Sequence, residues 1–110
     1  SSVMKNNTFE KIALIVSKIP RGKVASYGQI ADRYNQNNTG IISPKIVGFA
    51  MHANKDPKNV PCHRVVMKDG SLSRGYAFGS EEVQRKILQS EAVEFVNKKV
   101  DISFFIDKLA

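Results

Sequence analysis

The sequence predicts a single small α+β domain that is mainly helical and contains a helix-turn-helix. Four segments combine helix-start signals with apolar residues at helical spacing, namely 8–19, 27–34, 44–53 and 81–91. Near the C-terminus, residues 93–96 and 99–102 alternate as the strands of a small hairpin do. A chain of 110 residues with 42% hydrophobic content can fold around one modest core and is too short for two.

The first predicted helix, residues 8–19, is interpreted as scaffold. Asn7 and Glu10 resemble a capping box. Apolar residues then recur at the spacing of one helix face, at Phe9, Ile12, Ala13, Val16 and Ile19. We therefore expect residues 1–7 to form a tail ahead of a domain that spans residues 8–110. Residues 1–3 precede Met4, which indicates a remnant of cloning.

Two short helices joined by a polar loop are predicted next. Ser26 and Gln29 form a Ser-x-x-Gln capping box for the helix over residues 27–34. Residues 35–40 are asparagine-rich and end in glycine, which predicts an exposed turn.

The second of the two helices also has a clear start. Ser43 takes the N-cap and Pro44 the first position of the helix over residues 44–53. On a basic domain, such a pair is typical of a helix-turn-helix whose second helix recognises DNA, although any helical hairpin has the same pattern.

The C-terminal part is expected to add a helix and a hairpin to the core. Ser80 caps the helix over residues 81–91, whose inward side chains are predicted to be Val83, Ile87 and Leu88. The hairpin turns at Asn97 and Lys98. A last apolar segment is expected to dock on the core through Phe104, Phe105, Ile106 and Leu109.

The charge balance favours a polyanionic partner. The chain has 17 basic and 10 acidic residues, and a net charge of +7 on a small domain favours DNA or RNA, although it can serve solubility alone. No apolar run approaches membrane-spanning length, and no signal peptide is visible. The single cysteine excludes an internal disulfide framework and a cysteine-rich zinc site. It fits a reducing compartment, cytoplasmic or, in a eukaryote, nuclear.

That cysteine, Cys62, is the strongest candidate for chemistry. Pro61 precedes it and stiffens the chain, and His63 and Arg64 follow it directly. A thiol is a nucleophile only as its thiolate, and neighbouring positive charge or a partner base lowers its pKa. The alternative is a buried structural cysteine beside a surface His-Arg pair, because adjacency in sequence does not make a catalytic pair.

The hexapeptide Pro61-Cys62-His63-Arg64-Val65-Val66 resembles the active-site motif of the O6-alkylguanine-DNA alkyltransferases. Residues 26–31 resemble the tyrosine-containing helix of that family, and residues 47–51 resemble its recognition helix. The resemblance runs from about Phe9 to Glu91 and includes Asn54, Gly70 and the loop 75–79. It implies a winged-helix-like DNA-binding domain that acts as a monomer on double-stranded DNA containing O6-alkylguanine, with no cofactor and no metal.

The resemblance also implies a role for each matched residue. Cys62 accepts the alkyl group from a nucleotide flipped out of the duplex. His63 relays the proton through water, Glu91 orients His63, and Asn54 braces the turn. The residues implied to line the guanine pocket are Tyr27, Met51, Pro57, Val65, Tyr76 and Ala77. The residues implied to contact DNA are Tyr27, Ser43, Lys45, Ile46, Gly48 and Arg64.

Several positions depart from the family pattern. Lys45 stands where the family inserts an arginine wedge through the minor groove, and lysine keeps the charge without the flat guanidinium. Ala77 replaces a frequent serine. Pro44, Ile46 and Phe49 stand where the family has small residues around its wedge.

Two other functions stay open. Alkyltransferase-like proteins, which this chain is similar to in beginning at the reactive domain, bind alkylated DNA without repairing it. They flag the lesion for excision-repair proteins and typically replace the cysteine. A helix-turn-helix regulator without catalysis would leave the cysteine motif and Glu91 unexplained. The presence of Cys62 favours transfer, a single-turnover methyltransferase reaction in which the protein is consumed.

Overall fold

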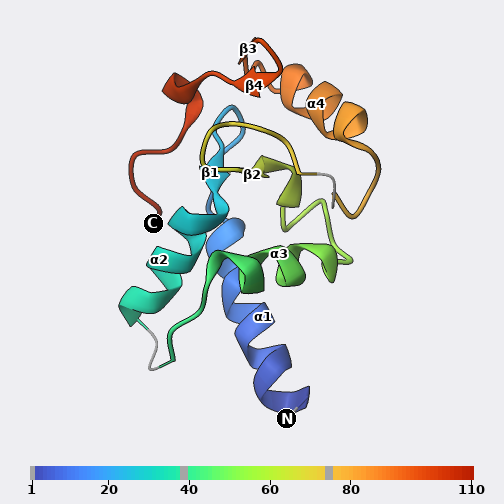
Figure 1. The fold of residues 1–110 in the computed structure, drawn as a ribbon. Helices are drawn as coiled ribbons and strands as arrows, with labels where there is room; N and C mark the ends of the chain where they lie inside the picture. Colours follow the sequence, from blue (N-terminus) through green and yellow to red (C-terminus); the bar gives the residue numbers. More distant parts are fainter. Residues whose placement is uncertain (1, 38–39, 74–75) are drawn as a thin grey trace.

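The chain forms a cluster of helices α1 to α3 at one end and a smaller layer of short strands, a hairpin and α4 at the other (Figure 1). The computed structural model describes residues 2–37, 40–73 and 76–110. Its helices are α1 (Ser2–Val16), α2 (Tyr27–Asn37), α3 (Pro44–His52) and α4 (Glu81–Ser90), with 3-10 turns at Cys62–Arg64 and Ile102–Phe104. Its strands are β1 (Ala25–Ser26), β2 (Val65–Val66), β3 (Phe95–Val96) and β4 (Lys99–Val100). The mainly helical α+β class predicted from the sequence is confirmed.

The helix-turn-helix consists of α2 and α3, which pack on α1 around the larger core. Buried side chains from all three helices, among them Ile12, Ile30 and Val47, meet Cys62 and Val65 there. Apolar burial of this kind is the main force that holds short helices in place. The cysteine motif is therefore attached directly to the core that positions α3.

Local hydrogen bonds fix both ends of α2. The predicted capping box is present, because Gln29 N–H donates to Ser26 Oγ at 3.0 Å and Ser26 N–H donates to Gln29 Oε1 at 2.9 Å. At the other end, Asn35 Nδ2 donates to the Ile42 carbonyl at 3.0 Å, and Asn35 Oδ1 accepts from Ile42 N–H at 2.8 Å. These contacts set the turn from which α3 starts.

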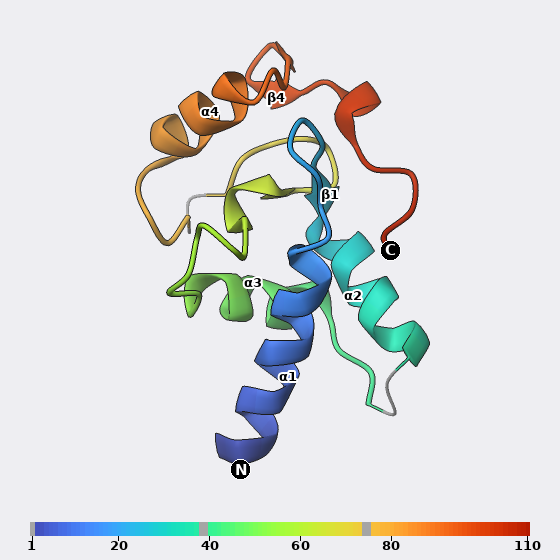
Figure 2. The same cartoon turned by 180° about the vertical axis from the view of Figure 1, so that it is seen from behind.

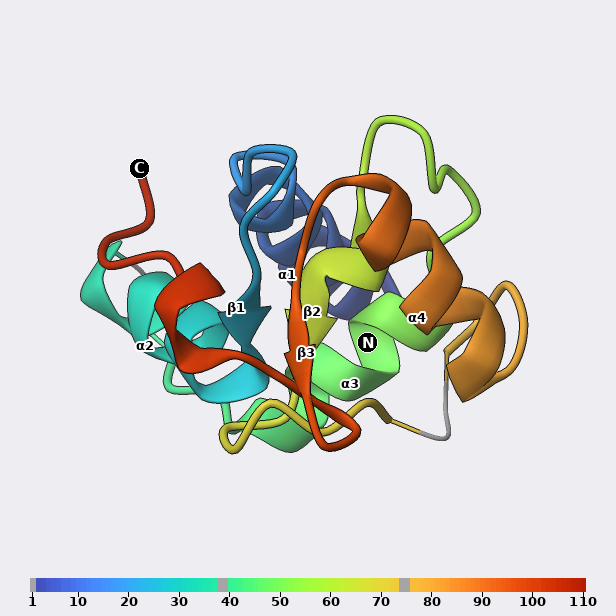
Figure 3. The ribbon, with the colours of Figure 1, turned by 90° about the horizontal axis from the view of Figure 1, so that it is seen from above.

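A short parallel strand pair joins the helix-turn-helix to the cysteine segment. β1 pairs with β2 in a register that places Ala25 opposite Val65 and Ser26 opposite Val66. Figure 3 shows the two strands side by side, and Figure 1 shows the hairpin of β3 and β4 at the same end of the molecule as α4. Because α2 follows β1 directly, this register fixes the start of α2 relative to the cysteine motif.

A second, smaller core lies under α4 and the hairpin, and includes Val24, Val66 and Leu88. The predicted hairpin is confirmed with shorter strands, since β3 and β4 pair antiparallel around Asn97 and Lys98. The C-terminal segment docks as predicted and runs back beside β1 toward α2 (Figure 2). Within the described residues, no helix is both long and apolar enough to cross a membrane.

Two predicted helices have wrong boundaries. α1 begins at Ser2 and ends at Val16 rather than spanning residues 8–19, so Asn7 lies inside the helix rather than at its cap. Residues 2–7 contain no glycine or proline that would stop the helix. α2 continues to Asn37 and takes up residues 35–37, which were predicted as loop. The rest of that loop includes residues 38–39, which lie outside the described residues.

Candidate active site

A tight turn holds Cys62 against the core. Cys62 N–H donates to the Val60 carbonyl at 2.7 Å, and Arg64 N–H donates to the Pro61 carbonyl at 2.9 Å. Asn54, just after α3, donates from Nδ2 to the same Val60 carbonyl at 2.9 Å. The side chain that the resemblance names as a brace therefore ties the end of the recognition helix to the turn that carries the cysteine.

Burial sets the protonation state of the Cys62 thiol. The residue is 4% exposed, and burial raises the pKa of the thiol against the lowering effect of Asn54 and of the backbone N–H groups of Cys62 and His63. The resting side chain is therefore a neutral thiol at pH 7, and it needs a base before it can act as a nucleophile.

His63, the next residue in the chain, forms a hydrogen-bonded pair with Glu91. His63 Nε2 lies 2.9 Å from Glu91 Oε1, although the residues are 28 positions apart in the chain. Burial lowers the pKa of His63 and outweighs the raising effect of Glu91, so the imidazole is neutral at pH 7. An ionised carboxylate only accepts hydrogen bonds, so the ring proton sits on Nε2 and Nδ1 keeps its lone pair. Nδ1 is therefore the basic atom of this pair.

Arg64 binds the same carboxylate from the other side. Its Nε donates to Glu91 Oε1 at 3.0 Å, its Nη2 to Glu91 Oε2 at 2.8 Å, and its Nη1 to the Ile19 carbonyl at 2.8 Å. Burial would raise the pKa of Glu91, but the hydrogen bonds from Arg64 and His63 prevail and hold that pKa below its ordinary value. The carboxylate is therefore ionised at pH 7.

This contact gives Arg64 a structural partner inside the domain. The side chains of Arg64 and Glu91 are only 16% and 9% exposed, so the guanidinium faces the carboxylate rather than solvent. If Arg64 turned outward, the carboxylate would lose its only oppositely charged partner among the described residues. The DNA contact expected for Arg64 stays a prediction.

Sequence reasoning missed Gln84. Val83 was predicted to face inward on α4, but Val83 is 40% exposed and Gln84 is 1% exposed. Gln84 Nε2 donates to the carbonyls of His63 at 3.0 Å and Val65 at 3.3 Å, so α4 holds the backbone on both sides of Arg64. The signal in the sequence was the spacing, because Gln84 lies one helix turn before the buried Leu88.

Two tyrosines lie close enough to Cys62 for its charge to affect them. Tyr27 is the first residue of α2, and Tyr76 lies in the loop before α4. Burial raises the pKa of both hydroxyl groups, a negative charge on Cys62 adds to both rises, and Ser73 acts against the rise at Tyr27. Both tyrosines are therefore neutral hydrogen-bond donors at pH 7.

The four other residues expected to line the guanine pocket differ in their burial. Met51 and Val65 are buried in the core cluster that contains Cys62. Ala77 is half-buried next to Tyr76, and Pro57 is exposed in the loop after α3. Met51 and Val65 therefore share a core cluster with the cysteine. The pocket roles of these two residues, Ala77 and Pro57 stay predictions.

A groove of about 480 Å³ opens on the outer face of α3, beside Tyr27. Its lining consists of Tyr27, Pro44, Lys45, Gly48, Phe49, His52, Met67 and Ser73. Three of the residues expected to contact DNA, Tyr27, Lys45 and Gly48, are thus gathered here. Ser43 is exposed at the N-cap of α3, whereas Ile46 packs partly against the core.

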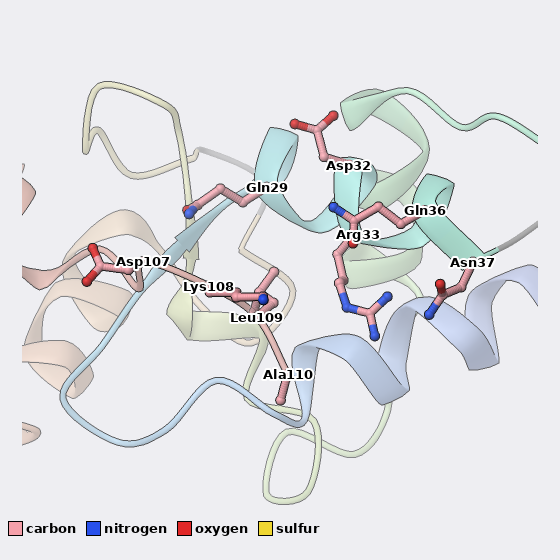
Figure 4. Close-up of a pocket in the computed structure, with 9 residues that line it drawn as sticks. All are labelled: Gln29, Asp32, Arg33, Gln36, Asn37, Asp107, Lys108, Leu109 and Ala110. Atoms are coloured by element: carbon pink, nitrogen blue, oxygen red, sulfur yellow. The ribbon is translucent and has the colours of Figure 1, made fainter.

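A second cavity, of about 450 Å³, lies between α2 and the C-terminal residues (Figure 4). Its lining is mostly polar and charged and consists of Gln29, Asp32, Arg33, Gln36, Asn37, Asp107, Lys108, Leu109 and Ala110. No residue predicted for the site lines it, so the cysteine motif and the α3 groove remain the candidate site. Among the described residues, no group of three histidine, cysteine or acidic side chains is placed to hold a metal ion.

Comparison with known families gives one clear match. Residues 7–93 match the family described as 6-O-methylguanine DNA methyltransferase, DNA binding domain. A methylated-DNA–protein-cysteine methyltransferase of Methanocaldococcus jannaschii is 39% identical over 90 residues, which cover 82% of this chain and 48% of that protein. A bifunctional methyltransferase/endonuclease of Picrophilus torridus is 32% identical over 88 residues, 80% of this chain and 28% of that protein. The chain thus spans about half or less of the length of these curated relatives.

Solved structures agree with this match. S. pombe Atl1, crystallised with damaged DNA containing O6-carboxymethylguanine, superimposes with a TM-score of 0.77 at 28% identity over 93% of this chain and 96% of that one. The O6-methylguanine-DNA methyltransferase of Pyrococcus kodakaraensis gives a TM-score of 0.61 at 36% identity, over 82% of this chain and 46% of that one. The similarity therefore extends over almost the whole of the S. pombe Atl1 chain and about half of the Pyrococcus chain.

Proposed function

Because this chain belongs to the family of 6-O-methylguanine DNA methyltransferases, we propose that it repairs alkylated DNA by direct reversal. The alkyl group on guanine O6 passes irreversibly to Cys62, and each protein molecule acts once. It acts as a monomer on double-stranded DNA and uses no cofactor, because the protein itself is the acceptor. The observation that carries this proposal is a cysteine that is directly followed by a histidine bound to a buried, ionised glutamate.

The proposed step balances with the groups at hand. Cys62 Sγ attacks the alkyl carbon in line, a carbon–sulfur bond forms, and the carbon–O6 bond breaks with its electron pair left on guanine. The thiol proton passes through water to Nδ1 of His63, and the departing guanine takes up one proton. Glu91 stabilises the imidazolium that forms in between, as the carboxylate of a catalytic triad does.

The target base must leave the helix before this step, because O6 lies within the stacked duplex. Tyr27 and Tyr76, both neutral, donate hydrogen bonds to the flipped base or its phosphate. Met51 and Pro57 contact the base through apolar surface. Backbone groups of Val65 and Ala77 read its edge, which makes the missing serine hydroxyl at Ala77 a small loss.

The proposed DNA-binding face is the outer side of α3. Lys45 takes the place of the wedge that fills the gap left by the flipped nucleotide. Ser43 and Gly48 lie close to the sugar-phosphate backbone of the DNA. A Cβ atom added at Gly48 would meet no other atom within 4 Å, so the helix surface there leaves room for this approach. Ile46 supports the face from behind, because it packs partly on the core.

A second candidate function rests on a specific observation. The chain matches almost the full length of the S. pombe protein that was crystallised with damaged DNA. Under this alternative, the protein binds O6-alkylguanine in DNA and marks it for excision-repair proteins without transferring the alkyl group. A regulator without catalysis ranks last, because it gives no role to the contact between His63 and Glu91.

One experiment separates these functions. The purified protein is incubated with duplex DNA that contains O6-methylguanine, and its intact mass is measured. Transfer adds about 14 Da to the peptide that contains Cys62, as expected for an activated thiolate. Cys62→Ala should bind the lesion without any gain in mass, while Lys68→Ala, an exposed neighbour of the motif, serves as the matched control. An unchanged mass with tight lesion binding would select lesion recognition, and absence of DNA binding would refute both.

A further inference from the structure

We propose that Phe49 supplies the stacking surface of the DNA wedge, together with the charge of Lys45. The proposal rests on the proposed function, since it presumes that the protein opens a base stack. Lysine at position 45 carries charge but no flat surface on which an unpaired base can stack. The structure places an exposed aromatic ring one helix turn away, on the same face.

The first observation is the position of the ring. Phe49 is 51% exposed although it lies in the middle of α3, where Val47 and Met51 are buried and Ile46 is partly buried. Positions 45 and 49 are four residues apart, so their side chains are neighbours on the helix surface. Lys45 Nζ lies 5.9 Å from the centroid of the Phe49 ring, within the range of a cation–π contact. The two side chains form one unit in which the ring orients the ammonium group.

The second observation is the groove in which the ring lies. Phe49 lines it on one side, and Met67, which is 46% exposed, lines it as well. The space over Gly48 is open. This groove thus combines an exposed aromatic face, a polarisable methionine and open helix backbone.

The charge around the groove indicates its occupant. Lys45 lines the groove, none of the described residues that line it is acidic, and the chain carries a net charge of +7. Exposed aromatic rings beside cations are the usual platform for unstacked nucleobases, because each base offers a π face and each nucleotide a phosphate. Apolar side chains also act as wedges between base steps in minor-groove proteins. We therefore infer that the occupant is a base exposed when the lesion is flipped.

The test compares three substitutions on two substrates. Phe49→Ala should slow transfer on duplex DNA about tenfold more than transfer from free O6-alkylguanine base, which needs no flipping. Phe49→Trp should restore the duplex rate, because indole stacks at least as well as phenyl. Phe49→Leu should not restore it, because leucine keeps apolar surface without a ring. Val96→Ala removes an exposed apolar side chain from β3 and is the matched control.

A binding measurement tests the same idea without transfer. In a Cys62→Ala background, Phe49→Ala should lower the ratio of affinities for lesion and undamaged duplexes, because only the lesion is flipped. Because no alkyl group is transferred in this background, the measurement tests the stacking role of Phe49 separately from the proposed transfer to Cys62. An equal loss on both duplexes would mean that Phe49 is a general DNA contact. Equal slowing on duplex and free base would mean that it only shapes the pocket, and rescue by Phe49→Leu would exclude stacking.

Discussion

Glu91 offers the sharpest test of the site, because one carboxylate holds two partners. The change to examine is Glu91→Gln, which keeps the shape of the side chain and removes its charge. Glu91 accepts from His63 at 2.9 Å and from Arg64 at 3.0 and 2.8 Å, and its side chain is 9% exposed. The substitution therefore leaves a largely buried guanidinium without its counter-charge, and it replaces the charged acceptor of the histidine with a neutral, weaker one.

The size of the effect on stability follows from that burial. Removing one partner of a buried ion pair costs about 3–5 kcal/mol. Arg64 keeps its hydrogen bond to the Ile19 carbonyl and is 16% exposed, so we expect the lower end, about 3 kcal/mol. For a domain of this size, that loss lowers Tm by roughly 10–20 °C. Transfer should slow by about 10²-fold, the lower end of what a positioned general base contributes.

Two assays measure these effects separately. Urea unfolding followed by far-UV circular dichroism gives the free energy of unfolding, since the chain contains no tryptophan to follow by fluorescence. Single-turnover transfer from free O6-methylguanine gives the chemical step without DNA binding. Glu94→Gln changes an exposed glutamate three positions later and is the matched control. The double variant with Arg64→Leu and Glu91→Leu should lose less stability than the sum of its single variants, because it leaves no stranded charge.

Three results would contradict this reasoning. A loss of stability within about 0.5 kcal/mol of that for Glu94→Gln would show that the pair behaves as a surface contact. Transfer at the wild-type rate in a folded Glu91→Gln variant would show that His63 needs no orienting carboxylate. Additive effects of Arg64→Leu and Glu91→Leu would contradict the coupling that the geometry implies.

Four further predictions follow from other contacts. Lys45→Ala should slow transfer on duplex DNA far more than on the free base and Lys45→Arg should restore it, whereas equal slowing on both substrates would remove Lys45 from the wedge. Gln84→Leu should cost about 2 kcal/mol in urea unfolding, because it removes the side-chain donor that the buried carbonyls of His63 and Val65 share. A cost no larger than that of the exposed Gln89→Leu would show that Gln84 does not hold this backbone in place. Burial lowers the pKa of His63, so folding disfavours its protonated form, and the free energy of unfolding should fall as pH drops from about 6.5 through the lower folded pKa. His63→Gln should flatten that part of the stability curve, and a curve of unchanged shape would count against a buried neutral imidazole. The logarithm of affinity for duplex DNA should fall linearly with the logarithm of salt concentration, and salt-independent binding would contradict a phosphate-binding face.

Features that depend on near neighbours could be predicted from the sequence. The capping box at Ser26, the N-cap at Ser43 and the turn at Asn97 each involve residues a few positions apart, and all lie where they were expected. The cysteine motif was found in the same way, because its residues are consecutive. Glu91 was assigned only through the family resemblance, because no local pattern links it to a histidine 28 positions away.

The direction of side chains was decided by tertiary structure. The side chain of Arg64 turns inward because the carboxylate of Glu91 and the carbonyl of Ile19, in the turn after α1, both accept from it. Gln84 rather than Val83 faces the core, because α4 packs on the backbone of the cysteine turn and two carbonyls there need a donor. Phe49 remains exposed because neither core extends to that face of α3. The sequence alone determined the local elements and the candidate cysteine, whereas the fold decided which charges are paired inside and which side chains stay exposed.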